Sequence, residues 1–225
     1  MSSVSSETLQ LGHDDAAFIL GKNGRTKEKI ARVAECALDL NDSERLEIRG
    51  NDRARRRAKK YVECVMKQRH GPVHIDANDD DDDDLTLLQV PMEAVGFVTG
   101  TGGNFLRALE EEWGTLMFFT GHGRDHHAQE KAATESLAIF GSLRSRRGCE
   151  LKVLSAVESK EPGLAKMDFD ENRVDGDDAF GSSYRVLASG DISYALGKRG
   201  ATRKKLAQAT LLGFPRDPMG SPRVA

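Results

Sequence analysis

Three tetrapeptides of the form Gly-x-x-Gly are the parts of this chain whose residue types and spacing could do chemistry. They are Gly21-Lys22-Asn23-Gly24, Gly100-Thr101-Gly102-Gly103 and Gly197-Lys198-Arg199-Gly200. Two glycines around two other residues allow a tight turn between helices and leave the backbone N–H groups of that turn uncovered. Together with the positive end of the following helix dipole, such amides form a site for anions such as phosphate.

Basic side chains accompany two of the three tetrapeptides. Lys22 lies in the first, Lys198 and Arg199 lie in the third, and Arg25 directly follows the first. The second tetrapeptide carries no charge. We therefore expect the second to hold an anion less strongly than the first, because each lost cation removes a phosphate contact.

The tetrapeptides belong to a longer repeat whose register holds without gaps. An aliphatic residue stands ten positions before each first glycine and an aromatic residue stands three positions before it. The aliphatic residues are Leu11, Val90 and Leu187, and the aromatic residues are Phe18, Phe97 and Tyr194. Repetition at a fixed spacing predicts three copies of one structural unit.

A second block repeats independently of the glycines. Residues 45–69 align without gaps with residues 136–160 and share seven identities over 25 positions. Alternation across Leu46 and Ile48, followed by Gly50, predicts a strand that ends in a turn. The helical spacing of Ala58, Val62 and Val65 predicts a helix after it.

The two blocks together predict the order strand, helix, Gly-x-x-Gly, helix, strand, strand, helix. In the first copy we expect strands near 8–11, 37–40 and 45–49 and helices near 14–20, 25–36 and 52–68. The second copy is expected to have a strand at 116–119 and a 12-residue insertion within 121–135. Only 25 residues follow Gly200, so the third copy is expected to be incomplete.

Acidic segments separate the copies. We expect a first domain at 6–70, a second at 85–160 and a partial third at 183–225 with an irregular, proline-containing tail. The segments 71–84 and 161–182 are expected to be disordered linkers, since charge repulsion and few apolar residues oppose folding. The six aspartates from Asp79 to Asp84 are interpreted as a solvated spacer.

The element order and the segment Phe18-Ile19-Leu20-Gly21-Lys22-Asn23-Gly24 resemble the type I KH domain of poly(C)-binding proteins and vigilin. This resemblance implies an α+β fold: tandem type I KH domains, each a three-stranded antiparallel sheet packed by three helices (βααββα), with a truncated third copy. In the family the loop holds the backbone of about four nucleotides. The implied partner is single-stranded RNA, or single-stranded DNA.

The resemblance also implies which residues would line a groove for bases beside the first loop. They are Ala17, Leu20, Arg25, Leu38 and Leu40. In the second copy, Thr99 stands where the family has an apolar residue. The second copy is therefore interpreted as a weaker binder, a spacer or a module that contacts protein partners.

Catalysis, metal binding and cofactors have little support in the sequence, so no catalytic residue, metal or cofactor is expected. His122, His126 and His127 lack a fixed carboxylate or cysteine partner. Three separated cysteines suggest neither disulfides nor a thiolate site. A nucleotide-binding fold is an alternative, but Phe105 stands where its third glycine would be. A protein-interaction scaffold without RNA binding remains a second alternative.

The basic run from Arg53 to Lys60 is open to three interpretations: a nuclear localisation signal, a phosphate-binding patch or a solvated helix face. Trp113 could stack on a base or pack in a core. No apolar stretch is long enough to span a membrane or to act as a signal peptide, so we expect a cytoplasmic or nuclear protein. The net charge of −3 hides a basic segment, because residues 21–69 hold 15 Lys and Arg against 8 Asp and Glu.

Overall fold

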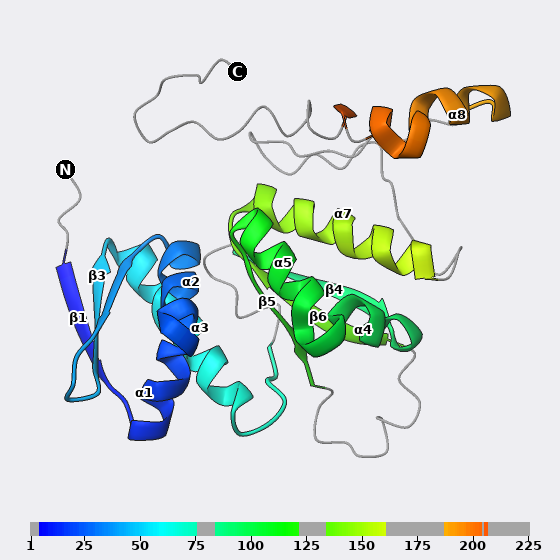
Figure 1. The fold of residues 1–225 in the computed structure, drawn as a ribbon. Coiled ribbons are helices and arrows are strands. Elements are labelled where there is room, and N and C mark those ends of the chain that lie inside the picture. Colours follow the sequence, from blue (N-terminus) through cyan, green and yellow to red (C-terminus); the bar gives the residue numbers. More distant parts are fainter. Residues whose placement is uncertain (1–4, 76–83, 122–133, 161–186, 204, 207–225) are drawn as a thin grey trace, which may run out of the picture. The chain divides into compact units, whose positions relative to one another are not determined.

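The computed structural model describes residues 5–75, 84–121, 134–160 and 187–206, without 204 (Figure 1). Residues 5–160 belong to one unit, which holds the first and second copies of the repeat. Residues 187–206 belong to a second unit, which holds the third copy. In the part of the chain that the structure describes, no helix has the length and apolarity needed to cross a membrane.

The first copy is a three-stranded antiparallel sheet with three helices. Its elements are β1 (Ser5–Gln10), α1 (His13–Leu20), the 3₁₀ turn η1 (Lys22–Gly24), α2 (Arg25–Ala34), β2 (Ala37–Leu40), β3 (Arg45–Gly50) and α3 (Asp52–Gln68). The strands are ordered β1-β3-β2, with Leu9 opposite Leu46 and Leu38 opposite Ile48. Asn51 caps α3, because its side chain accepts a hydrogen bond from the amide of Ala54 at 2.8 Å.

The second copy repeats this order. Its elements are β4 (Leu85–Pro91), α4 (Met92–Thr99), η3 (Thr101–Gly103), α5 (Asn104–Trp113), β5 (Leu116–Thr120), β6 (Thr134–Phe140) and α7 (Leu143–Lys160). The strands are ordered β4-β6-β5 and are antiparallel. The expected α+β class with three-stranded antiparallel sheets is therefore confirmed. The expected insertion falls between β5 and β6, and residues 122–133 lie outside the described residues.

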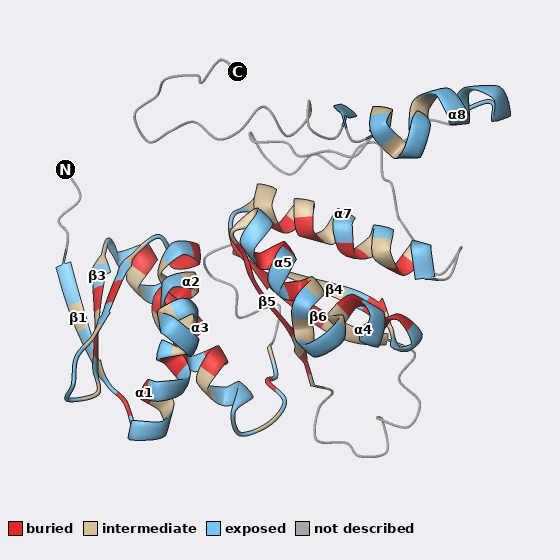
Figure 2. Cartoon of the chain, in the orientation of Figure 1, coloured by how far each residue is buried: buried red, intermediate tan, exposed pale blue. Residues whose placement is uncertain are grey.

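The two sheets differ in how many of their faces are buried. In the first copy, Leu46 and Ile48 of β3 are buried while Arg45 and Arg49 of the same strand are exposed, so only the face toward the helices is covered. In the second copy, β5 is buried at nearly every position, and Figure 2 shows the contrast with the mostly exposed β1. A strand without alternation is covered on both faces.

Helix α3 of the first copy covers the second face of the second sheet. Alternate residues of β5 and β6 join the core of the first copy, among them Leu116, Phe118 and Phe140. The intervening residues, such as Met117 and Ile139, join the core under α5 and α7. The ring of Tyr61 in α3 lies 5.1 Å from the ring of Phe140, centroid to centroid. The first and second copies thus share one hydrophobic core rather than standing apart on a tether.

The acidic linker departs from its expected role at its two ends. Val73 is buried in the shared core, and Asp84, counted above as part of a solvated spacer, is fully buried. Asp84 accepts a hydrogen bond from Tyr61, pairs with Lys60, and lies 3.4 Å from Nε of Arg57. A buried carboxylate is tolerated when it is paired and hydrogen-bonded in this way. The expectation of a solvated spacer is wrong at Asp84, and residues 76–83 lie outside the described residues.

The basic run of α3 is partly structural. Arg55 donates to the carbonyl of Gly50 at 3.0 Å, and its counterpart Arg146 in the second copy donates to Gly141 at 3.1 Å. Both arginines thus close the turn between the last strand and the last helix of their copy. Arg55, Arg57 and Lys60 of the basic run therefore have partners within the protein.

The third copy is described from residue 187 to 206. It contains α8 (Ser189–Leu196) and η4 (Lys198–Gly200), followed by helical residues at 201–203. These match the first half of the repeat. The expected linker at 161–182, the tail at 211–225 and the histidines of the insertion lie outside the described residues.

Candidate nucleic-acid interface

The first Gly-x-x-Gly loop joins α1 to α2 by a left-handed turn. Gly21 has φ 66° and ψ 179°, Asn23 has φ 57° and ψ 31°, and Gly24 has φ 77° and ψ 1°. The amide of Gly21 donates to Ala17 at 3.0 Å, so α1 runs directly into the loop. The amide of Gly24 donates to the carbonyl of Gly21 at 3.3 Å and closes the turn.

The second and third loops have the same geometry. Gly100 and Gly197 have φ of 71° and 67° with extended ψ, as at Gly21. Gly102 and Arg199, at the third position of each loop, have φ of 58° and 55°. One local sequence pattern therefore produces one backbone conformation in three places, including the third copy.

The first glycine of each loop is required for two reasons. Its φ is in the left-handed region, which disfavours residues with a Cβ atom. A Cβ atom at Gly21 or at Gly197 would also lie 2.1 Å from the hydroxyl oxygen of Thr26 or Thr202, the second residue of the next helix. The fourth glycine is less crowded, since a Cβ atom at Gly24 would meet nothing closer than Oε1 of Glu28 at 3.7 Å.

The two central amides of each loop are free. Among the described residues, the backbone N–H groups of Lys22 and Asn23 donate to no protein acceptor, and the same holds for the two central residues of the other loops. The side chains of Lys22 and Asn23 are exposed, so these amides belong to an exposed turn. Each loop therefore offers two adjacent donors at the start of a helix, a geometry that suits an anion.

The expected groove residues of the first copy are only partly at the surface. Ala17, Leu20 and Arg25 are exposed beside the loop. Leu40 is half-buried, whereas Leu38 is buried in the core. The side chain of Leu38 points from β2 into the core, so it is not accessible to a ligand.

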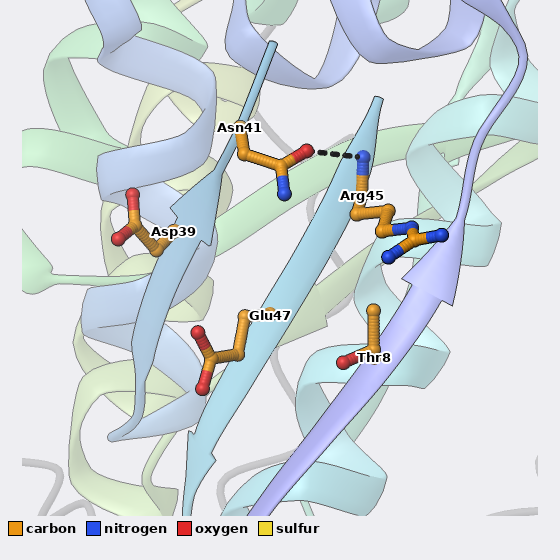
Figure 3. A pocket seen from close by; sticks show the side chains of 5 residues that line it. All are labelled: Thr8, Asp39, Asn41, Arg45 and Glu47. Atoms are coloured by element: carbon orange, nitrogen blue, oxygen red, sulfur yellow. Dashed lines mark hydrogen bonds between the residues drawn. The ribbon is translucent and has the colours of Figure 1, made fainter. Parts of the chain in front are cut away.

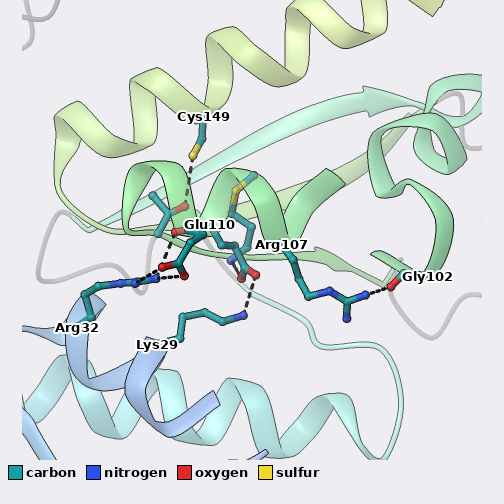
Figure 4. Close-up of polar contacts among 9 residues, drawn as sticks. Lys29, Arg32, Gly102, Arg107, Glu110 and Cys149 are labelled. Atoms are coloured by element: carbon teal, nitrogen blue, oxygen red, sulfur yellow. Dashed lines mark hydrogen bonds and ion pairs between the residues drawn. The ribbon is translucent and has the colours of Figure 1, made fainter. Parts of the chain in front are cut away.

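Arg107 supplies the second loop with the positive charge that its tetrapeptide lacks. Its guanidinium donates to the carbonyl of Gly102 (Figure 4). It also lies 3.4 Å from Oδ1 of Asn104. The Gly-x-x-Gly pattern does not include this residue, because it lies outside the tetrapeptide. Helical spacing contains the signal, since Arg107 stands four positions after Gly103 and so lies one turn into α5.

Two acidic residues in the second half of α5 form ion pairs with two cations of α2. Lys29 lies 2.7 Å from Glu110 (Figure 4). Arg32 lies 3.2 Å from Glu111. The hydrogen bond and charge of Arg32 lower the pKa of Glu111. Lys22 and Arg25, at the loop itself, are exposed.

A polar depression lies away from the loops. It is lined by Thr8, Asp39, Asn41, Arg45 and Glu47 on the exposed face of the first sheet (Figure 3). The amide of Arg45 donates to Asn41 Oδ1 at 3.0 Å within it. Two carboxylates line this depression, which therefore does not suit a phosphate. In the described part of the chain, no group of three or more His, Cys, Asp and Glu residues could hold a metal ion.

Comparison with known proteins gives structural similarity alone. No family model matches the chain, and no curated protein matches it. Among solved structures, Dim2p from Pyrococcus horikoshii OT3 is 15% identical, covers 68% of this chain and 90% of its own length, and has a TM-score of 0.28. The same protein in a complex with a/eIF2alpha and rRNA is 16% identical, with coverages of 71% and 86% and a TM-score of 0.28.

A protein of unknown function from Aeropyrum pernix is 14% identical, with coverages of 70% and 84% and a TM-score of 0.27. Similarities of this size carry no information about function.

Proposed function

We propose that residues 5–160 form two type I KH domains that bind single-stranded nucleic acid, and that RNA is the natural ligand. One observation carries the proposal: the same left-handed loop occurs three times, each time with two free amides at the start of a helix. A run of phosphates is the ligand that such repeated anion sites suit. The repeated order of strand, helix, loop, helix, strand, strand and helix supports the KH assignment.

The first copy is proposed as the stronger binder. It combines the free amides with Lys22, Arg25 and the exposed Ala17 and Leu20. The second copy would contribute through Arg107 and its loop, from residue 100 to 103. Because the two copies share a core, their loops would be held on one rigid block, and a strand that reaches both would gain affinity without ordering a linker.

The test is a charge reversal at the first loop. The double variant K22D/N23D puts two carboxylates where phosphates would lie, and it should weaken binding of ten-nucleotide RNAs at least tenfold by fluorescence anisotropy. The salt dependence of log Kd should also become shallower, because a phosphate contact is lost. The same titrations with DNA of equal sequence would show which of the two nucleic acids is preferred.

The chain offers a matched control. The double variant S43D/R45D makes the same charge change at the turn between β2 and β3, where both residues are exposed. That turn lies beside the first residue of α1, since His13 contacts Glu44 at 2.7 Å, whereas the Gly-x-x-Gly loop follows the last residue of α1. The control should bind as the wild type does. Equal binding by a folded K22D/N23D variant would reject the loop as the binding site, and no binding of any RNA or DNA by the wild type would favour the protein scaffold.

A further inference from the structure

An aromatic side chain is exposed at the same position in all three copies. Phe18, Phe97 and Tyr194 each stand three residues before the first glycine of a loop, and they are 41%, 51% and 87% exposed. The residue that follows is buried in the first two copies, as Ile19 and Val98. The core therefore does not require an aromatic residue at this position, and its repetition calls for another explanation.

Helix geometry places each ring beside its loop. Residues three apart on a helix are neighbours on one face, about 5–6 Å apart at their Cβ atoms. The helix hydrogen bond from Gly21 to Ala17, and its counterparts from Gly100 to Gly96 and from Gly197 to Ser193, carry each helix into the loop. Leu20 and Leu196, next to the first and third loops, are also exposed apolar residues. The surface next to these anion sites is thus apolar.

We propose that Phe18, Phe97 and Tyr194 are stacking platforms for bases of the strand whose phosphates the loops hold. This inference rests on the proposed function and adds binding residues to it. A ligand that fits the combined surface must carry anions and flat apolar groups a few ångströms apart. A single-stranded nucleic acid has this chemistry at every nucleotide, and stacking on an aromatic ring accepts any base.

Stacking and phosphate contacts leave different signatures. Removing a stacked ring costs about 1–3 kcal/mol per base, which corresponds to about a 5- to 150-fold loss of affinity. A stacking contact releases no counterion, so its loss should leave the slope of log Kd against log salt unchanged. The loop variant K22D/N23D should change both the affinity and the slope.

The experiment uses the full chain and the tightest-binding of the four ten-nucleotide homopolymer RNAs. Phe18→Ala should weaken binding at least fivefold with an unchanged salt slope, and Phe18→Trp should retain binding. Leu151→Ala is the matched control, because Leu151 is a large apolar residue on α7 that is 55% exposed. The control should bind as the wild type does.

A series of RNAs with one abasic nucleotide then tests the contact itself. At one position in the series, the effect of Phe18→Ala should disappear, because the base that stacks on the ring is absent. Wild-type binding together with equal affinities of the Phe18→Ala and Leu151→Ala variants would overturn the inference and leave the proposed function intact. A Phe18→Ala effect that persists at every abasic position would also overturn it. Failure of the wild type to bind any of the four RNAs would overturn the proposed function itself.

Discussion

Nζ of Lys29 and Oε2 of Glu110 lie 2.7 Å apart, although 81 residues separate them in the sequence. The side chain of Glu110 is only 5% exposed, and its other oxygen accepts a hydrogen bond from the amide of Met117 at 2.9 Å. This carboxylate therefore ties α2 of the first copy to both α5 and β5 of the second. The ion pair joins the two copies at the edge of their shared core.

Breaking this pair should destabilise the chain more than breaking its exposed neighbour. Lys29→Met leaves the buried carboxylate of Glu110 without its cation and should cost about 3 kcal/mol in the free energy of unfolding. Arg32→Ala removes the exposed pair with Glu111, which solvent screens, and should cost less than Lys29→Met. Urea denaturation followed by circular dichroism measures both values. Equal costs for the two variants would show that the buried pair does not join the copies.

The shared core predicts that the two copies unfold together. The chain has one tryptophan, Trp113 in α5, which packs against Gly148 of α7 and reports on the second copy alone. Tryptophan fluorescence and circular dichroism at 222 nm should therefore give the same urea midpoint. Phe140→Ala should lower both midpoints together, with a cost of about 3–5 kcal/mol. Two separated midpoints in the wild type would contradict a common core.

The two glycines of the first loop should differ in their tolerance of alanine. Gly24→Ala places a Cβ atom without a collision at φ 77° and should cost about 1–2 kcal/mol from the left-handed conformation alone. Gly21→Ala adds a collision with Thr26 and should cost more. Gly96→Ala is the control, since Gly96 lies inside α4 with no positive φ and nothing within 4 Å, and it should be neutral or stabilising. Equal costs at Gly21 and Gly24 in thermal denaturation would contradict the crowded turn.

Arg107 should act as the phosphate contact of the second loop. Arg107→Ala should weaken RNA binding and lower the magnitude of the salt slope by about 1, as the loss of one phosphate contact does. Lys152→Ala is the control, because Lys152 is a partly exposed cation of the same copy that pairs with Glu112. An unchanged slope for Arg107→Ala would mean that the guanidinium only supports the backbone of the loop.

The buried thiol of Cys149 should make stability depend on pH in the alkaline range. Burial raises the pKa of Cys149 from 9.0 to about 11, and the hydrogen bond with Thr115 opposes this shift more weakly. The unfolded thiol ionises near pH 9 while the folded one stays protonated, so stability is unaffected below pH 9 and falls between pH 9 and 11. Cys149→Ala lacks this loss, so the stability difference between wild type and variant should shrink from pH 8 to pH 10.5. A constant difference would contradict a raised pKa.

Local features of the fold could be predicted from the sequence. The bounds predicted for the strand at 37–40 and the helix at 52–68 agree with β2 and α3. Helix α2 ends at Ala34, two residues before its predicted end, because Glu35 adopts a left-handed conformation that stops it. The three loops share one conformation because Gly-x-x-Gly acts through short-range sterics, which the residues within the turn decide.

The packing of the first and second copies was decided by tertiary structure alone. The apolar runs at 116–119 and 137–140 contain the signal of a sheet buried on both faces, but nothing in them says which surface covers the second face. Asp84 is indistinguishable in the sequence from the aspartates before it, and only its contacts with Tyr61 and Lys60 make it structural.

The sequence by itself thus determined the repeat, the element order and the left-handed loops, because these depend on neighbours within a few residues. Only the folded chain decided which charges stay available to a ligand. Lys29 and Lys60 are cations in the sequence as much as Lys22 is, but each pairs with a carboxylate that is distant in the sequence, Lys29 with Glu110 and Lys60 with Asp84. Whether a cation is available to bind a ligand depends on its contacts with residues that are distant in the sequence. Those contacts exist only after the two sheets and their helices have packed together.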